Sequence, residues 1–145
     1  MKKQTQQHEV HVQETVNLYQ DGQLAAQRKV PLLIIFSQID CAFCERLKEE
    51  VINPMLISGD YTDKVLIREF MIDHDEEITG FNGKSVEAIS VFYDYDLYVT
   101  PSVLLLDSQG NELAERQIGI NTVDYYSYYL DAAIDKARKI IRARP

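Results

Sequence analysis

The sequence of 145 residues predicts an α/β domain with a central mixed β-sheet between helices. Three observations favour this class. The apolar run at residues 32–36 does not alternate with polar residues, which is typical of a strand buried on both faces. Helical and extended patterns then follow one another along the chain, in the order α-β-α-β-α-β-β-α. The only two cysteines, Cys41 and Cys44, stand where the first strand gives way to a helix.

The N-terminal part of the chain divides into a polar segment and a helical pattern. We predict that residues 1–8 are disordered and that residues 9–145 form one domain, because this length suffices for a substantial core. Apolar residues recur at helical spacing from 9 to 29, which predicts one helix weakened at Gly22 or two short helices. Pro31 should end this segment, because proline lacks the N–H donor and disfavours a helical residue before it.

Two strands with a helix between them should form the centre of the sheet. Residues 30–37 are expected to form the first strand, and residues 42–53 the helix, whose N-terminus lies at the cysteines. Pro54 is expected to kink or end this helix. Residues 64–73 carry apolar side chains typical of a second strand. Because a helical crossover joins the two strands, they should be parallel.

The second half of the chain should contribute a helix and a β-hairpin. Residues 74–83 are polar and contain two glycines, which indicates a loop or a small insertion. Ser85 is placed to cap a helix over residues 86–96. Residues 99–107 and 112–118 then predict two antiparallel strands joined by a turn. A long amphipathic pattern predicts a final helix.

Composition and charge exclude several classes of function. Net charge is −8, which disfavours nucleic acid as a partner, because phosphate binding needs a basic face. No apolar stretch approaches the roughly 20 residues of a membrane span. The first residues lack the apolar region of a secretory signal, so we expect either a cytoplasmic protein or a chain that follows a removed signal or anchor. Nothing marks a dimerisation element, and we expect a monomer.

The cysteines are spaced C-x-x-C, which in an α/β context indicates redox chemistry. Cys41 should be the nucleophile, because unpaired N–H groups and the dipole at a helix N-terminus stabilise a thiolate. Cys44, one helical turn later, is placed to attack the mixed disulfide that Cys41 forms. Two thiols without chemistry are one alternative. Half of a zinc site is another, but it needs two more ligands, and the chain offers only His8, His11 and His74.

Two distant motifs occur in an order that resembles the thioredoxin superfamily. Cys41-x-x-Cys44 follows a strand, and Thr100-Pro101 opens the later hairpin, before a glycine and the final helix. The resemblance covers about residues 30–143 and implies a thioredoxin fold, to which the preceding residues add an N-terminal helix. A closer likeness to bacterial periplasmic proteins of the SoxW type rests on short segments: Phe36-Ser37-Gln38, Glu49-Glu50-Val51, Phe81-Asn82-Gly83-Lys84 and Val99-Thr100-Pro101-Ser102.

The resemblance also implies the parts of a substrate site. Pro101 would be cis and sit beside the Cys pair, although a trans proline at a strand entry is the alternative. The peptide group of Thr100 would offer an extended substrate a strand-like edge. Phe43 would present apolar surface nearby, unless it packs inward. In the SoxW-like relatives the electron donor is a membrane thiol transporter, which would place this protein in the periplasm.

Two positions depart from the family pattern. Asp40 replaces an aromatic or small neutral residue before the first cysteine, and its carboxylate should oppose ionisation of the Cys41 thiol. Its alternative role is a helix N-cap. Ile35 occupies the place of a buried aspartate that assists proton transfer in typical thioredoxins. Glu69, on the neighbouring strand, is a candidate substitute acid or base. Its alternative is a solvated carboxylate at a strand edge.

These observations lead to a thiol–disulfide oxidoreductase that reduces protein disulfides through Cys41 and Cys44. Such an enzyme needs no bound cofactor or metal, because the cysteine pair carries the electrons. It does need a thiol protein that donates electrons, which could be a membrane thiol transporter. The main alternative is a non-catalytic binding module that docks partners at the edge formed by a cis Pro101. A zinc-binding domain is the third hypothesis.

Overall fold

The computed structural model describes residues 10–145, so the segment predicted to be disordered, 1–8, lies outside the described residues. Its elements are β1 (Gln13–Glu14), α2 (Leu18–Arg28), β2 (Leu32–Ser37), α3 (Ala42–Leu47), the π-helix η1 (Lys48–Ile52), α4 (Asn53–Ser58), β3 (Leu66–Met71), β4 (Glu77–Thr79), β5 (Ser85–Glu87), α5 (Ala88–Asp94), β6 (Ser102–Leu106), β7 (Gln117–Ile118) and α6 (Val123–Ala143). Among the described residues, no helix combines the length and apolar character that crossing a membrane needs.

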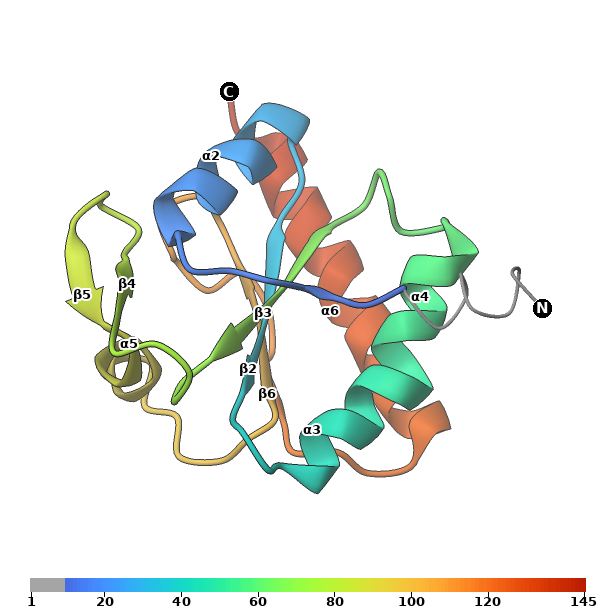
Figure 1. Cartoon of the computed structure of the whole chain (residues 1–145). Coiled ribbons are helices and arrows are strands. Elements are labelled where there is room, and N and C mark those ends of the chain that lie inside the picture. The colour runs from blue at the N-terminus through green and yellow to red at the C-terminus, as the bar shows by residue number, and fades with distance from the viewer. Residues whose placement is uncertain (1–9) are drawn as a thin grey trace.

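A mixed sheet in the strand order β1-β3-β2-β6-β7 forms the centre of the fold (Figure 1). β2 and β3 are parallel, and β6 and β7 continue the sheet in antiparallel pairings. The register places Glu69 of β3 and Val103 of β6 on either side of Ile35. The predicted mixed sheet, with early parallel strands and a late antiparallel hairpin, is confirmed.

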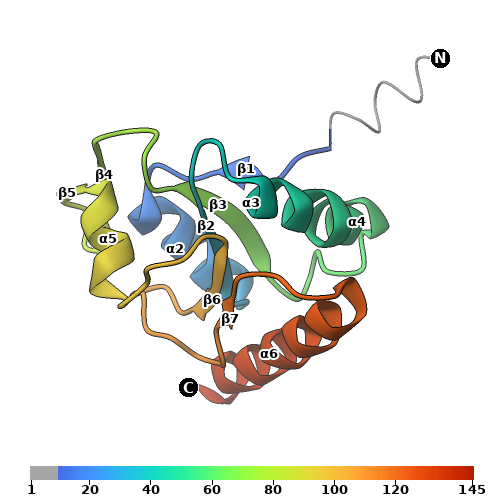
Figure 2. The same ribbon diagram turned by 90° about the horizontal axis from the view of Figure 1, so that it is seen from below.

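Helices cover both faces of this sheet (Figure 2). Alternate residues of β2 enter two separate cores, because successive side chains of a strand point to opposite faces. Leu33 and Ile35 pack on the side of α3, α4 and α6. Leu32, Ile34 and Phe36 pack on the side of α2 and α5. β2 is thus buried on both faces, as its unbroken apolar run predicts.

The helix predicted from residue 9 is shorter than expected, because β1 takes its first part. β1 pairs in parallel with β3, and the N–H of Thr15 donates to the carbonyl of Glu69 at 2.8 Å. The edge of β3 offers unpaired backbone N–H and C=O groups. Hydrogen bonds to these groups stabilise an extended segment more than its apolar spacing stabilises a helix. The N-terminal helix itself, α2, is confirmed, and Asn17 caps it by accepting from the N–H of Gln20.

α2 runs through Gly22 without a break, contrary to the predicted weak point. A Cβ at this position would lie 2.6 Å from the backbone oxygen of Ser108. The glycine therefore lets the turn after β6 approach the helix closely, which outweighs its low helix propensity.

Of the two outcomes predicted for Pro54, a kink or an end of the helix, the end is wrong. The chain stays helical from α3 through η1 and α4. This continuous helix ends at Gly59, which has a φ of 75°. In η1 the N–H of Asn53 donates to the carbonyl of Lys48, five residues back. This wider π-helical turn lies directly before Pro54, which has no backbone N–H to donate. The helix can then continue through the proline.

Ser85 does not cap a helix, so that prediction is also wrong. The predicted insertion is a small antiparallel hairpin of β4 and β5, and Ser85 lies in β5 opposite Thr79. Its hydroxyl donates to the carboxylate of Glu77 across the hairpin, and the residue that directly precedes the helix is Glu87. α5 begins only at Ala88.

Candidate active site

The two cysteines lie at the edge of the sheet where β2 and β3 both end. Cys41 is the N-cap of α3, and its Sγ accepts from the N–H of Cys44 at 3.2 Å. The two residues form a disulfide with their Cα atoms 5.2 Å apart. Cys41 is half-buried, whereas Cys44 is 0% exposed. Of the two sulfurs, that of Cys41 is therefore the one an incoming group can approach.

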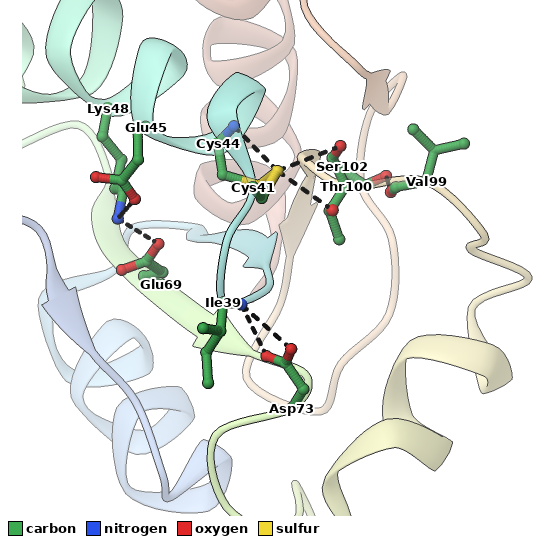
Figure 3. The surroundings of a disulfide bond; sticks show 10 residues. All are labelled: Ile39, Cys41, Cys44, Glu45, Lys48, Glu69, Asp73, Val99, Thr100 and Ser102. Carbon is green, nitrogen blue, oxygen red and sulfur yellow. Dashed lines mark hydrogen bonds and ion pairs between the residues drawn. A yellow bond between two sulfur atoms is a disulfide. The ribbon is translucent and has the colours of Figure 1, made fainter.

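The start of β6 faces Cys41 across this edge (Figure 3). Because β6 runs antiparallel to β2, its first residues lie beside the last residues of β2. Cys41 Sγ is 3.8 Å from the carbonyl oxygen of Thr100 and 3.5 Å from its hydroxyl oxygen. The Thr100–Pro101 peptide bond is cis. The fold thus brings the two sequence motifs together, although they are 59 residues apart.

Exposed apolar side chains occur in the segments next to the Cys pair. Phe43 is 60% exposed, so it does not pack inward. Tyr98 is 76% exposed and precedes the cis peptide by two residues. We call this surface the apolar rim, and its members are Ile39, Phe43, Tyr98 and Val99. Exposed aromatic side chains next to a reactive group are suited to contact a partner.

Asp40 is not the helix cap, which corrects one of the two roles considered for it. The N-cap needs extended backbone, and Cys41 has it, with φ −110° and ψ 102°. Asp40 has a left-handed φ of 59°, a conformation that Asp tolerates better than most residues. Its side chain is exposed. The carboxylate of Asp40 is therefore exposed to solvent, directly before Cys41 in the chain.

Glu69 is not a solvated strand-edge carboxylate. It is 7% exposed, and its Oε2 lies 2.9 Å from the Nζ of Lys48 in η1. The same Nζ lies 2.9 Å from the carboxylate of Glu45. Burial alone would lower the pKa of Lys48, but its hydrogen bonds to Glu45 and Glu69 and their charges outweigh burial and raise it. Lys48 is therefore a cation held over a buried carboxylate on the face of the sheet that α3 covers.

His74, a weaker acid–base candidate, is exposed, and its Nδ1 lies 3.0 Å from the carboxylate of Glu14. The hydrogen bond and the charge of Glu14 raise the pKa of His74. The carboxylate of Asp75 is close to this pair, and these three residues are the only cluster of metal-ligand type within residues 10–145. No cysteine belongs to it, so the described residues offer no third ligand for a zinc site at Cys41 and Cys44.

Sequence reasoning missed Asp73, which follows β3 and reaches the segment before the cysteines. Its Oδ1 accepts from the N–H of Ile39 at 2.9 Å, and Oδ2 is 3.2 Å from the same nitrogen (Figure 3). The available signal was its position at the carboxyl end of a predicted strand, where side chains gather at one edge of a parallel sheet. Tyr98 was missed too, and its place just before Thr100 was the signal.

Comparison with known proteins identifies relatives of this chain. A family model described as a thioredoxin-like domain matches residues 18–134. A mitochondrial thioredoxin of Saccharomyces cerevisiae in its oxidised form is 18% identical, with a TM-score of 0.55 over 83% of this chain and 94% of that one. A thioredoxin of Nicotiana alata is 24% identical, with a TM-score of 0.53 over 79% and 82%.

A thioredoxin-like protein of Clostridium perfringens is 17% identical, and it matches with a TM-score of 0.56 over 89% of this chain and 87% of that one. No curated protein sequence matches the chain. At these identities the structural likeness concerns the fold. What the site does must be argued from its own residues.

Proposed function

The chain belongs to the thioredoxin-like domain family, and from this premise we propose that it reduces disulfides in other proteins through Cys41 and Cys44. A thioredoxin fold with a close cysteine pair supports thiol–disulfide oxidoreductase chemistry in general. One observation carries the finer proposal. The half-buried Cys41 caps a helix beside Thr100, while Cys44 is wholly buried next to it, so that only one sulfur meets substrate.

The reaction begins with the dithiol form. The Cys41 thiolate attacks one sulfur of a substrate disulfide, an S–S bond forms between enzyme and substrate, and the other substrate sulfur leaves as a thiolate. Cys44, as its thiolate, then attacks Cys41 Sγ. The Cys41–Cys44 bond forms, the mixed disulfide breaks, and the second substrate sulfur leaves. Two electrons pass to the substrate, whose thiolates take up the two protons that the cysteines released.

Substrate docking is assigned to the edge beside Cys41. The peptide group of Thr100 lies close to Cys41 Sγ, so an extended segment that pairs with this backbone would place its own sulfur next to the nucleophile. Phe43 and the rest of the apolar rim would contact side chains on either side of the substrate disulfide. Pro101 keeps this backbone free of an N–H group of its own.

Glu69 is proposed as the acid–base group of the site. It is a buried carboxylate on β3, opposite Ile35, and it is paired with Lys48 from the helix that carries the cysteines. Lys48 follows Cys44 by four residues, about one helical turn. In this role the Glu69 carboxylate takes up the proton of a cysteine thiol as it becomes the attacking thiolate, and returns it to solvent or to the leaving sulfur.

The remaining parts of the proposal concern the surroundings of the enzyme. No bound cofactor is needed, because the cysteine pair carries the electrons, and a donor thiol protein must reduce it again. A likeness to SoxW-type proteins favours a membrane thiol transporter as donor and a periplasmic location, with the cytoplasm as the alternative. Protein disulfides are the substrates, and the chain acts as a monomer.

The decisive experiment equilibrates the protein against graded thiol–disulfide buffers and counts free thiols by alkylation and mass spectrometry. Cys41 and Cys44 should switch together as one two-electron couple, at a potential on the order of −270 mV for a reductase. A potential on the order of −120 mV would reverse the direction of electron flow. Cys44→Ser should trap a mixed disulfide with substrate, and Cys41→Ser should not. Absence of a reversible couple would instead favour the non-catalytic binding module that docks partners at the Pro101 edge.

A further inference from the structure

We propose that Asp73 is a positioning residue for Cys41. Its carboxylate holds the segment that carries the nucleophile by accepting the N–H of Ile39, and so keeps the Cys41 sulfur beside Thr100. This inference rests on the proposed function, because it concerns the efficiency of the same reaction. Among the described residues Asp73 forms no hydrogen bond with either cysteine, so we expect its effect to pass through the backbone.

The hydrogen bond continues the β2–β3 ladder beyond its backbone end. The last backbone hydrogen bond between the β2 and β3 segments runs from the N–H of Ile72 to the carbonyl of Ser37, at 2.9 Å. The N–H of Ile39, two residues further on, is bound by the side chain of Asp73 rather than by a backbone carbonyl (Figure 3). Among the described residues, this is the hydrogen bond that ties residues 38–40 to another part of the fold.

The segment 38–40 has little else to hold it. All three residues are exposed, so packing does not restrain them. Asp40 is in the left-handed region, which is less favourable than ordinary helical or extended backbone even for a residue that tolerates it better than most. Rotation at Asp40 would move Cys41 relative to the cis Thr100–Pro101 segment, from which its sulfur is separated by only 3.5–3.8 Å. Small displacements of a reacting atom lower rates strongly, because the attacking geometry is lost.

A carboxylate suits this task. An ionised acceptor forms a stronger hydrogen bond with a backbone N–H than a neutral one does, and it has no competing donor. Asp73 is itself exposed, so its removal should have little effect on the packed core. Its function should therefore be visible in the chemistry of Cys41 more than in the stability of the fold.

The test compares Asp73→Ala, which removes the acceptor, with Asp73→Asn, which keeps one neutral acceptor oxygen. Asp75→Asn is the matched control, because Asp75 is an exposed carboxylate of the same loop that does not bind residues 38–40. Three quantities are measured for each variant: the rate of reduction of a protein disulfide, the rate with a small aromatic disulfide, and hydrogen exchange of the Ile39 amide. Urea unfolding checks that each variant is folded.

Asp73→Ala should lower the rate with the protein disulfide about five- to tenfold, and Asp73→Asn should recover part of this loss. The small disulfide, which needs no alignment with Thr100, should lose less. Exchange of the Ile39 amide should speed up most in Asp73→Ala, less in Asp73→Asn and not at all in Asp75→Asn. The inference is overturned if Asp73→Ala reduces the protein disulfide at the wild-type rate. It is also overturned if Asp75→Asn lowers this rate as much as Asp73→Ala does, because the loss of charge alone would then explain the effect. If wild type itself shows no reversible couple, the proposed function fails, which is a separate result.

Discussion

Replacing Lys48 by methionine should leave a buried carboxylate without its cation. Lys48 Nζ lies 2.9 Å from the Oε2 of Glu69, whose side chain is only 9% exposed. Methionine preserves much of the apolar stem of lysine, so packing against the sheet is largely kept and the charge is the main loss. The free energy of unfolding should therefore fall.

The size of the effect follows from the burial of the pair. Removing one partner of a fully buried ion pair costs about 3–5 kcal/mol. The side chain of Lys48 is 19% exposed, so water already weakens the pair, and we expect a loss of about 2 kcal/mol. For a domain of this size the Tm should fall by about 4–8 °C.

Urea unfolding at pH 7 of four proteins measures this effect: wild type, Lys48→Met, Glu69→Gln and the double variant. Glu69→Gln should lower the free energy of unfolding less than Lys48→Met does, because Lys48 keeps Glu45 as a partner. The double variant should be more stable than Lys48→Met alone, since no buried charge remains. The reasoning is refuted if Lys48→Met unfolds at the same urea concentration as wild type, or if the double variant is no more stable than Lys48→Met.

Three further predictions concern single positions. Asp40→Asn keeps the tolerance for a left-handed backbone and removes the charge, so alkylation of reduced Cys41 at pH 7 and low salt should speed up about twofold; an unchanged rate would show that the carboxylate is inert. Gly22→Ala should lower the free energy of unfolding, measured in urea, by about 1 kcal/mol. The new Cβ would lie 2.6 Å from the backbone oxygen of Ser108, and this overpacking exceeds the helix-propensity gain of about 1 kcal/mol. A stabilised variant would contradict the close approach. The raised pKa of His74 means that its contact with Glu14 stabilises the fold below the unfolded pKa and is lost as the pH rises through the folded pKa; NMR titration should therefore show Glu14→Gln lowering the His74 pKa.

The central strand and the cysteine pair were predictable because their signals are local. An unbroken apolar run needs burial on both faces wherever it lies, and β2 is buried along its whole length. The C-x-x-C spacing puts both sulfurs on one helical turn regardless of the rest of the fold, so Cys41 and Cys44 were recognisable before any contact was known. The mixed sheet followed from the order of the elements, and it is confirmed.

Predictions failed where a distant partner changed the local preference. The residues of β1 have helical spacing, but the free edge of β3 was available to pair with them. Ser85 has a capping side chain, but β4 supplied another partner for its hydroxyl. In both cases hydrogen bonds to a segment distant in the sequence outweigh a local preference worth about 1 kcal/mol.

The sequence by itself determined the α/β class, the buried β2 strand and the close cysteine pair, because periodicity and spacing are properties of neighbouring residues. Only the tertiary structure decided what surrounds that pair. It placed Thr100 beside Cys41, buried Glu69 under Lys48 and brought Asp73 to the N–H of Ile39. These contacts join residues that are tens of positions apart, and they exist because the ends of β2 and β3 and the start of β6 meet at one edge of the sheet.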